Sequence, residues 1–169
     1  HLLDDKTTML KMTQFMYNIA EYVSDRLKAD RDFMLKLVKQ DGSALKYASA
    51  ELKDDDEVVL AAIEQNGRNI IYANSRFQED RELVLKVVKK QGYSLEVLSD
   101  KFKDDKEIVL QAVRHAGGGV LRAASLRLQN DEDIAKEQNA NNRNTCKAIN
   151  LISFLCKLIL SNLLTNSQL

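Results

Sequence analysis

The chain has 169 residues, of which 30% are charged, and its 25 basic residues are balanced by 25 acidic ones. This length suits one domain that can bury a core without disulfides or a structural metal. The balanced charge argues against a free-standing nucleic-acid binder, which usually carries a basic excess on one face.

The start of the chain shows no secretory signal, because charged residues begin at Asp4. The two cysteines, Cys146 and Cys156, form neither a CxxC pair nor a disulfide framework of the kind found in secreted domains. We interpret them as free thiols and expect a cytoplasmic, reducing compartment. The first residue is His1 rather than Met, which suggests a piece of a longer protein.

A repeat of 25 residues dominates the sequence. It is clearest in four columns: Asp30, Asp55, Asp80 and Asp105; Leu35, Leu60, Leu85 and Leu110; Val38, Ile63, Val88 and Val113; and Gly42, Gly67, Gly92 and Gly117. We interpret residues 1–29 as a degenerate first copy, 30–130 as four regular repeats, and 131–145 as a broken repeat with an Asn-rich linker. One extra residue, placed in the Gly117–Gly119 run, brings the last copy into register.

Each repeat is predicted to form two short helices. The aspartate that opens it can cap the first helix by accepting hydrogen bonds from first-turn amides, and the glycine is expected to end that helix in a left-handed conformation. Ser43, Asn69 and Ser94 are predicted to open the second helix, which would end at Leu52 and its equivalents. With no proline and no alternation of apolar and polar residues, the predicted fold is all-α: a solenoid of tandem helix-turn-helix repeats stabilised by stacking.

Residues 146–169 differ from the repeats. From Lys147 to Leu164 the sequence is apolar except for polar residues at i+3 and i+4 spacing, which predicts one apolar helix. We expect this helix to cap the open end of the last repeat. Pairing with a second copy of the chain is the next alternative, and contact with a membrane surface the third. The run is shorter than the ~20 residues that span a bilayer.

The string Asp-x-Glu-φ-Val-Leu-x-x-φ-x-x-x-Gly, followed by φ-x-x-Ala-Ser, resembles the repeat known as domain of unknown function 4116. Its best copies are Asp55–Phe77 and Asp80–Phe102. The resemblance covers residues 30–130 well, residues 5–29 poorly, and the tail not at all. Such repeats are similar to arrays in protists, giant viruses and intracellular bacteria that inject effector proteins into host cells. The resemblance implies an interaction scaffold, with a module of a bacterial effector in the host-cell cytosol as one context, and it implies no catalytic residue.

We find no constellation of catalytic, metal-binding or cofactor-binding residues. The two histidines, His1 and His115, match no metal-ligand spacing, and the acidic clusters recur with the repeat and are explained by capping. The Gly117–Gly119 run lacks the Gly-Lys-Ser/Thr ending of a phosphate loop. We therefore expect no enzyme activity, no cofactor and no metal. The alternative is a catalytic chain with its chemistry where the repeat breaks, around Gly117–Arg143.

A column of tyrosines is the first candidate surface for a partner. Tyr22, Tyr47 and Tyr72 occupy one position in three successive copies, and Val97 and Arg122 follow them. Exposed aromatic rings are favoured as interface anchors, so we predict Tyr22, Tyr47, Tyr72 and Arg122 as partner-binding residues. Packing of the rings between neighbouring repeats is the alternative.

The polar strip of the first helices is the other surface. Its charge alternates along the column Lys39, Glu64, Lys89 and Arg114, which favours a solvated face over a phosphate-binding stripe. Glu82 and Lys86 are expected to pair, since they lie four residues apart on one helix. The predicted function is a non-catalytic scaffold for a protein or peptide partner. A catalytic or targeting arm of a larger enzyme and a nucleic-acid-binding helical repeat are the alternatives.

Overall fold

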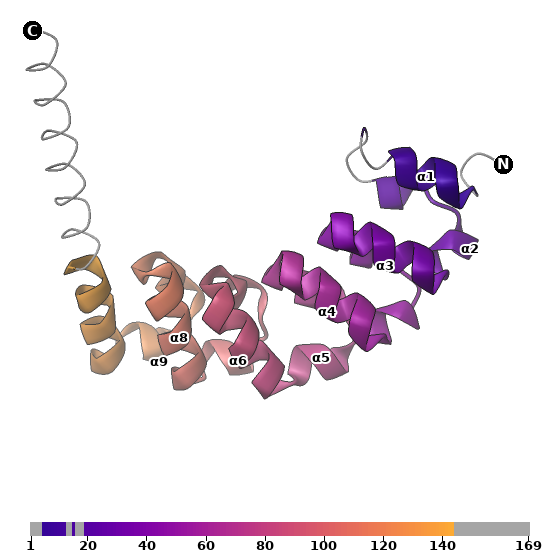
Figure 1. Cartoon of the computed structure of the whole chain (residues 1–169). Coiled ribbons are helices and arrows are strands. Elements are labelled where there is room, and N and C mark those ends of the chain that lie inside the picture. Colours follow the sequence, from indigo (N-terminus) through magenta and orange to yellow (C-terminus); the bar gives the residue numbers. More distant parts are fainter. Residues whose placement is uncertain (1–4, 13–14, 16–18, 144–169) are drawn as a thin grey trace, which may run out of the picture.

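The computed structural model describes residues 5–12, 15 and 19–143. Within these residues every regular element is a helix, and successive helices stack side by side into a curved array (Figure 1). The predicted all-α solenoid is therefore confirmed.

Each regular repeat contains three helical elements rather than the two that were expected from the sequence. The first is an α-helix: α3 (Arg31–Gln40), α4 (Asp56–Gln65), α6 (Arg81–Lys90) and α8 (Lys106–Ala116). A six-residue 3-10 helix follows: η3 (Gly42–Tyr47), η5 (Gly67–Tyr72), η6 (Gly92–Val97) and η7 (Gly118–Ala123). A short helical turn leads to the next repeat: η4 (Leu52–Asp54), α5 (Ser75–Glu79), α7 (Asp100–Lys103) and α9 (Leu126–Gln129).

The first and last copies follow the same plan in part. The described elements of the first copy are α1 (Lys6–Met12), η2 (Ile19–Glu21) and α2 (Asp25–Lys28). A further helix begins at residue 132 and runs at least to residue 143, the last residue described. Residues 138–143, predicted as part of a linker, are therefore helical.

The second helix ends early because the chain turns to bond the preceding repeat. After η3, Ala48 is extended, with φ −63° and ψ 155°, and the Ser49 amide donates to the carbonyl oxygen of Lys28 at 3.0 Å. The same bond joins Asn74 to Lys53 and Ser125 to Lys103, both at 2.8 Å. Since these amides are used between repeats, the helix predicted to reach Leu52 stops at Tyr47 instead.

The aspartate caps predicted for the long helices are confirmed. Asp30 accepts from the Phe33 amide at 2.9 Å and Asp55 from the Val58 amide at 3.0 Å. The caps of the 3-10 helices lie earlier than predicted. Asp41 accepts from the Ser43 amide at 2.9 Å, so that η3 begins at Gly42 rather than at Ser43.

The left-handed conformation predicted for the glycine column is wrong for Gly42, Gly67 and Gly92. Among the described glycines only Gly117 has a positive φ, 76°. The extra residue of the fifth copy lies in α8, which has 11 residues where the other long helices have 10, so that Gly117 takes the C-cap place of Asp41 and Gly118 begins η7. Gly42, Gly67 and Gly92 lie where the following repeat approaches closely.

The final helix joins the array through polar as well as apolar contacts. Asp131 accepts from the amides of Asp133 and Ile134 at 3.0 and 3.3 Å, and Ile134 is fully buried. The Asn141 side chain donates to the carbonyl oxygen of Val113 at 2.7 Å, at the end of α8. The polar side chain of Asn141 thus binds the last turn of α8 through a hydrogen bond. The apolar segment Lys147–Leu164 lies outside the described residues.

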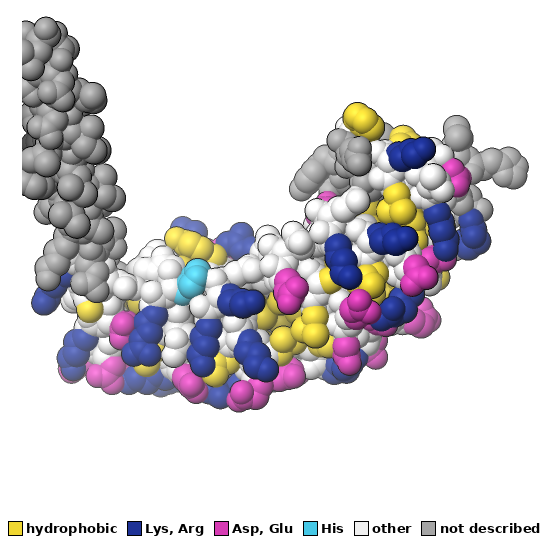
Figure 2. All heavy atoms as spheres, viewed as in Figure 1, with side chains coloured by type: hydrophobic (Ala, Val, Ile, Leu, Met, Phe, Trp, Pro, Cys, Tyr) yellow, Lys and Arg dark blue, Asp and Glu magenta, His cyan; other side chains and the backbone are white. Residues whose placement is uncertain are grey.

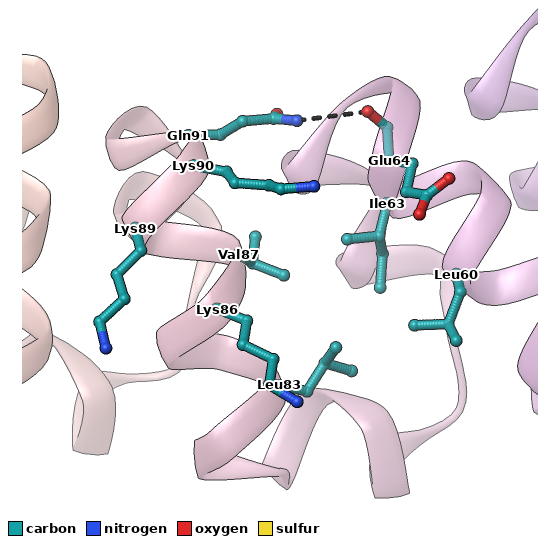
Figure 3. A pocket seen from close by; sticks show the side chains of 9 residues that line it. All are labelled: Leu60, Ile63, Glu64, Leu83, Lys86, Val87, Lys89, Lys90 and Gln91. Atoms are coloured by element: carbon teal, nitrogen blue, oxygen red, sulfur yellow. Dashed lines mark hydrogen bonds between the residues drawn. The ribbon is translucent and has the colours of Figure 1, made fainter.

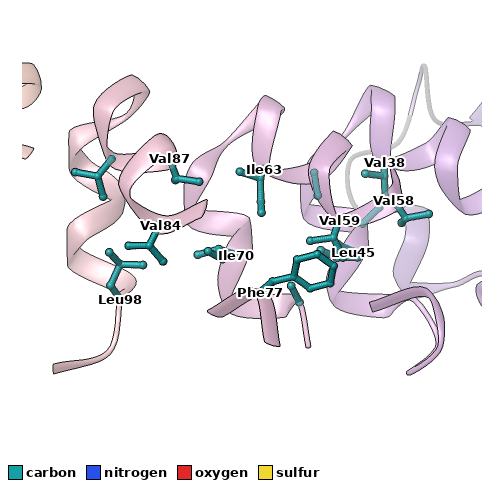
Figure 4. Close-up of a cluster of buried hydrophobic side chains, with 14 of the residues drawn as sticks. Val38, Leu45, Val58, Val59, Ile63, Ile70, Phe77, Val84, Val87 and Leu98 are labelled. Atoms are coloured by element: carbon teal, nitrogen blue, oxygen red, sulfur yellow. The ribbon is translucent and has the colours of Figure 1, made fainter. Parts of the chain in front are cut away.

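A hydrophobic core runs along the array from repeat to repeat. Val38 of α3, Val59 of α4 and Val84 of α6 are among its fully buried members, and Figure 4 shows side chains of successive repeats meeting. A ten-residue helix is only marginally stable by itself in water. Each repeat therefore depends on its neighbours for burial.

Candidate functional site

The row of long helices is interrupted between α4 and α6. Helix α3 packs against α4 and α6 against α8, whereas direct packing between α4 and α6 is sparse. The 3-10 helices, by contrast, contact one another in an unbroken series from η3 to η7. A pocket of about 380 Å³ opens between α4 and α6, and we call it the α4–α6 groove (Figure 3). Its lining residues are Leu60, Ile63, Glu64, Leu83, Lys86, Val87, Lys89, Lys90 and Gln91.

Ion pairs clamp the other long helices together at their N-terminal ends. Arg31, the first residue of α3, bonds Asp55 from Nε at 2.8 Å and Glu57 from Nη2 at 2.7 Å. These hydrogen bonds from Arg31 hold the pKa of Asp55 and of Glu57 below their ordinary values. The pairs formed in the same way at other junctions are Lys6 with Asp30, Arg81 with Asp105 and Glu107, and Lys106 with Asp131 and Asp133.

The clamp is missing where the groove opens. Its cation is replaced by Asp56, the first residue of α4, which bonds Arg76 of α5, in the same repeat, at 2.7 Å. Asp80 and Glu82 occupy the positions at which Asp55 and Glu57 receive Arg31. Within the described part of the chain neither of these two acids has an ion-pair partner.

A larger side chain also separates the two helices. Position 87 of α6 is valine, whereas the equivalent residues of α4 and α8 are Ala62 and Ala112. A Cβ built on Gly92 would lie 2.6 Å from the Ala112 carbonyl oxygen, so the alanine lets the helix backbone come close. A Cβ built on Gly67 would lie 2.6 Å from Cγ1 of Val87. The valine side chain therefore fills space that backbone fills in the next repeat, and it spaces α6 away from α4.

The opening leaves apolar side chains in contact with solvent. Leu60 is 42% exposed, and Leu83 is half-buried although Val58 and Ile108 at the same position of α4 and α8 are fully buried. Figure 2 shows hydrophobic side chains gathered between α4 and α6 on the face of the long helices. Contiguous exposed apolar surface on a folded chain marks a candidate interaction site.

Three lysines lie beside the exposed apolar residues of the groove, Leu60 and Leu83. Lys86, Lys89 and Lys90 project from α6, and Glu64 is the single acidic residue of the lining (Figure 3). No described residue forms an ion pair with any of the three lysines, and the pair predicted between Glu82 and Lys86 is absent. At one end the Gln91 side chain donates to the Glu64 carbonyl oxygen at 3.5 Å and closes the groove.

The predicted tyrosines lie on the row of 3-10 helices and not at the groove. Tyr22 is 55% exposed, while Tyr47 and Tyr72 are half-buried and pack against the hydrophobic core. The Tyr47 hydroxyl donates to Glu21 Oε2 at 3.3 Å, which links two successive copies. Two of the three rings therefore contribute to packing between repeats.

Arg122 does not share the position of the tyrosines. Because α8 is one residue longer, Ala123 ends η7 as Tyr47 ends η3, and Arg122 takes the place that Glu96 has in η6. Arg122 Nη2 bonds Glu96 Oε1 at 3.3 Å and remains largely exposed. The structure thus brings Arg122 to an ion pair between repeats.

The groove residues fit their repeat columns, and for this reason sequence reading missed them. Leu60 belongs to an apolar column and the lysines belong to a polar strip. Two differences from the flanking junctions carry the available signal: Asp56 where Arg31 and Arg81 stand, and Val87 where Ala62 and Ala112 stand, although α3 also has a large residue, Leu37, at this second position.

No part of the described chain brings three or more His, Cys, Asp or Glu side chains together in a way that could hold a metal ion. The region around Gly117–Arg143 is the predicted location of the alternative catalytic site. There, hydrogen bonds from Lys106 lower the pKa of Asp131 and of Asp133, and these shifts follow from the ion pairs between α8 and the next helix. His115 Nδ1 accepts from the Gly92 amide at 3.2 Å. None of the described helices has the length and apolar character needed to cross a bilayer.

The fold and the groove define a helical-repeat solenoid with one opened junction. A family model described as Domain of unknown function (DUF4116) matches four overlapping segments, residues 5–53, 30–78, 55–103 and 80–121. These matches cover residues 5–121, so the chain belongs to this family, and the predicted resemblance is confirmed. The first three matches each span two consecutive repeats, 80–121 ends within the second one, and 55–103 contains both helices that line the groove. No curated protein and no solved structure matches the chain.

Proposed function

We propose that the chain is a non-catalytic binding module that holds a polypeptide partner in the α4–α6 groove. The observation that carries this proposal is the exposed apolar surface of Leu60 and Leu83, at the one junction of the described long helices that lacks the ion pairs at their N-terminal ends. An apolar groove between helices suits a segment that inserts one or two hydrophobic side chains. Burying a leucine-sized side chain there would contribute about 1.5–3 kcal/mol to binding.

The opening is not forced by the repeat architecture. An arginine in place of Asp56 and an alanine in place of Val87 are the residues with which neighbouring junctions close. Leu60 and Leu83 instead remain partly in water, which costs stability in the unbound chain. A bound partner that covers both leucines offsets this cost.

The surface of Tyr22, Tyr47, Tyr72 and Arg122 is the alternative location for the same function. The exposure of Tyr22 supports it, while the packing of Tyr47 and Tyr72 leaves those two rings less area to offer. The resemblance implies a module of an injected effector as one context. In that context the proposed binding site would still be the α4–α6 groove.

A selection from a displayed library of random peptides against the folded 169-residue chain tests the proposal. The recovered peptides are titrated into methyl-labelled protein and followed by NMR. We expect the methyl resonances of Leu60, Ile63, Leu83 and Val87 to shift. Replacement of the exposed Leu60 by serine should weaken binding about fivefold or more, because an apolar contact is lost.

Leu126→Ser is the matched control, since Leu126 is 77% exposed and lies in α9, away from the groove. It should change affinity less than about twofold. Thermal unfolding of both variants verifies that they fold. Failure to recover a groove-binding peptide, or resonance shifts confined to Tyr47 and Tyr72, would refute the location.

A further inference from the structure

Resting on the proposed function, we infer that the partner of the α4–α6 groove is an acidic segment, with Asp or Glu beside its apolar anchor. The lysines of α6 carry this inference. Lys86 and Lys90 are four residues apart, so they share one side of the helix, and Lys89 contributes to the lining although its side chain extends away from α4. Figure 3 shows Lys86 and Lys90 extending toward α4.

Most other cations of the long helices have an ion-pair partner, although Lys36 of α3, like the lysines of the groove, has none among the described residues. Arg31, Arg81, Lys106 and Arg114 each bind an acid of the following repeat. The lysines of the groove lack any such partner among the described residues. Lys86 and Lys90 also lie four residues apart, where like charges repel. An acidic ligand would remove that repulsion and supply the missing partners.

The lining carries an excess of positive charge next to an apolar floor. Against three lysines it holds one acid, Glu64, at the edge formed by α4. A purely apolar ligand would leave the lysines unpaired at the edge of a dehydrated contact, which costs free energy. A ligand that combines an apolar side chain with carboxylates satisfies both parts of the site.

The chain's own apolar segment does not have this chemistry. Lys147–Leu164 is hydrophobic enough to fill the floor, but no acidic residue occurs after Glu137 in the whole sequence. Its charged residues are basic, as is the edge of the groove. Charge complementarity therefore favours a different polypeptide over the C-terminal segment of this chain or of a second copy.

Matched charge reversals of the full chain test the inference with the fluorescently labelled peptides recovered by display. Lys86→Glu should weaken binding about fivefold, and Lys86→Glu combined with Lys90→Glu about tenfold or more. Lys36→Glu is the control, because Lys36 occupies the position of Lys86 in α3 and lies outside the groove. It should alter the dissociation constant less than about twofold.

Neutral versions of the peptides complete the test. With Asp and Glu replaced by Asn and Gln, they should bind the natural chain about tenfold more weakly and the Lys86/Lys90 double variant with little further loss. Affinity for the acidic peptides should also fall as the salt concentration rises from about 50 to about 300 mM.

The outcomes separate the inference from the function beneath it. Peptides that require Leu60 but show no acidic enrichment, or no response to Lys86→Glu, overturn the acidic partner and leave the groove as a binding site. Recovery of no groove-binding peptide overturns both. If decanoate alone shifts the methyl resonances of Leu83 and Val87, the groove takes a small anionic amphiphile and the polypeptide assignment is wrong.

Discussion

Gly92 shows how a single residue sets the distance between repeats. Its φ is not left-handed, so a side chain is excluded by neighbours and not by backbone strain. A Cβ at this position would lie 2.6 Å from the Ala112 carbonyl oxygen and 2.8 Å from the Ala116 Cβ. Both contacts come from α8, one repeat further along the chain.

We expect Gly92→Ala to lower the free energy of unfolding by about 1–3 kcal/mol, the usual cost of overpacking. Urea denaturation followed by circular dichroism measures the change. Gly119→Ala is the control, since a Cβ there meets nothing within 4 Å. Equal losses in the two variants would contradict the close-approach explanation.

The clamp aspartates make stability depend on acid pH. Hydrogen bonds from Arg31 lower the pKa of Asp55 below its ordinary value of 3.8, against the opposing effect of partial burial. The folded chain therefore binds fewer protons than the unfolded chain in acid. The stabilisation is present above pH 3.8 and is lost as the pH falls through the lowered value.

We accordingly expect a melting temperature that changes little between about pH 7 and pH 5 and falls progressively below about pH 4. Arg31→Gln should make the fall less steep, because the pKa of Asp55 then moves back toward its ordinary value. Lys36→Gln, at an exposed site outside the clamp, should leave the profile unchanged. A profile insensitive to Arg31 would speak against the clamp as its cause.

At the scale of elements, the long helices are nearly equal in length, with 10 or 11 residues, but not in their contacts. The first residue of each helix decides whether it is tied to the next one, as Arg31 and Arg81 show. Asp56 leaves α4 untied from α6, and Val87 adds bulk at the same junction. The groove is thus the joint result of one charge and one side-chain volume.

Asp56→Arg should restore the clamp, because Asp80 and Glu82 already stand at the receiving positions. We expect stabilisation of up to about 1 kcal/mol, the usual range for exposed ion pairs. A thermal melt at low salt measures it, and the gain should shrink as salt is added. Arg31→Asp is the reciprocal variant and should lower the melting temperature. A lower melting temperature for Asp56→Arg would show that the junction is held open by other contacts.

At the scale of the whole molecule, each repeat is stabilised by packing against its neighbours. The row of 3-10 helices is continuous, whereas the row of long helices is interrupted at α4–α6. The array therefore has an internal weak link between α4 and α6. We infer two cooperative halves, one containing α3 and α4 and the other α6 and α8.

Hydrogen exchange in mild denaturant, read by mass spectrometry, should resolve these halves. Amides of α3 and α4 should open together, and those of α6 and α8 together with a different opening free energy. The Asp56→Arg variant should bring the two values closer. One shared opening free energy for all four helices in the natural chain would argue against an internal weak link.

Much of the fold follows from the sequence because its causes are local. Asp30 caps the amide of Phe33 three residues later, and the apolar columns repeat within each helix. Such contacts lie within one helical turn, so the residue order specifies the long helices and their number. The family resemblance rests on the same columns.

Only the tertiary structure decided where the 3-10 helices end and where the groove opens, because both features depend on atoms from different repeats. The Ser49 amide ends η3 by bonding Lys28, 21 residues earlier. The exposure of Leu60 depends on whether α6 reaches α4, which in turn depends on Asp56 and Val87. Identical columns give buried leucines at one junction and a groove at another, because packing is set by the pair of surfaces that meet and not by either one alone.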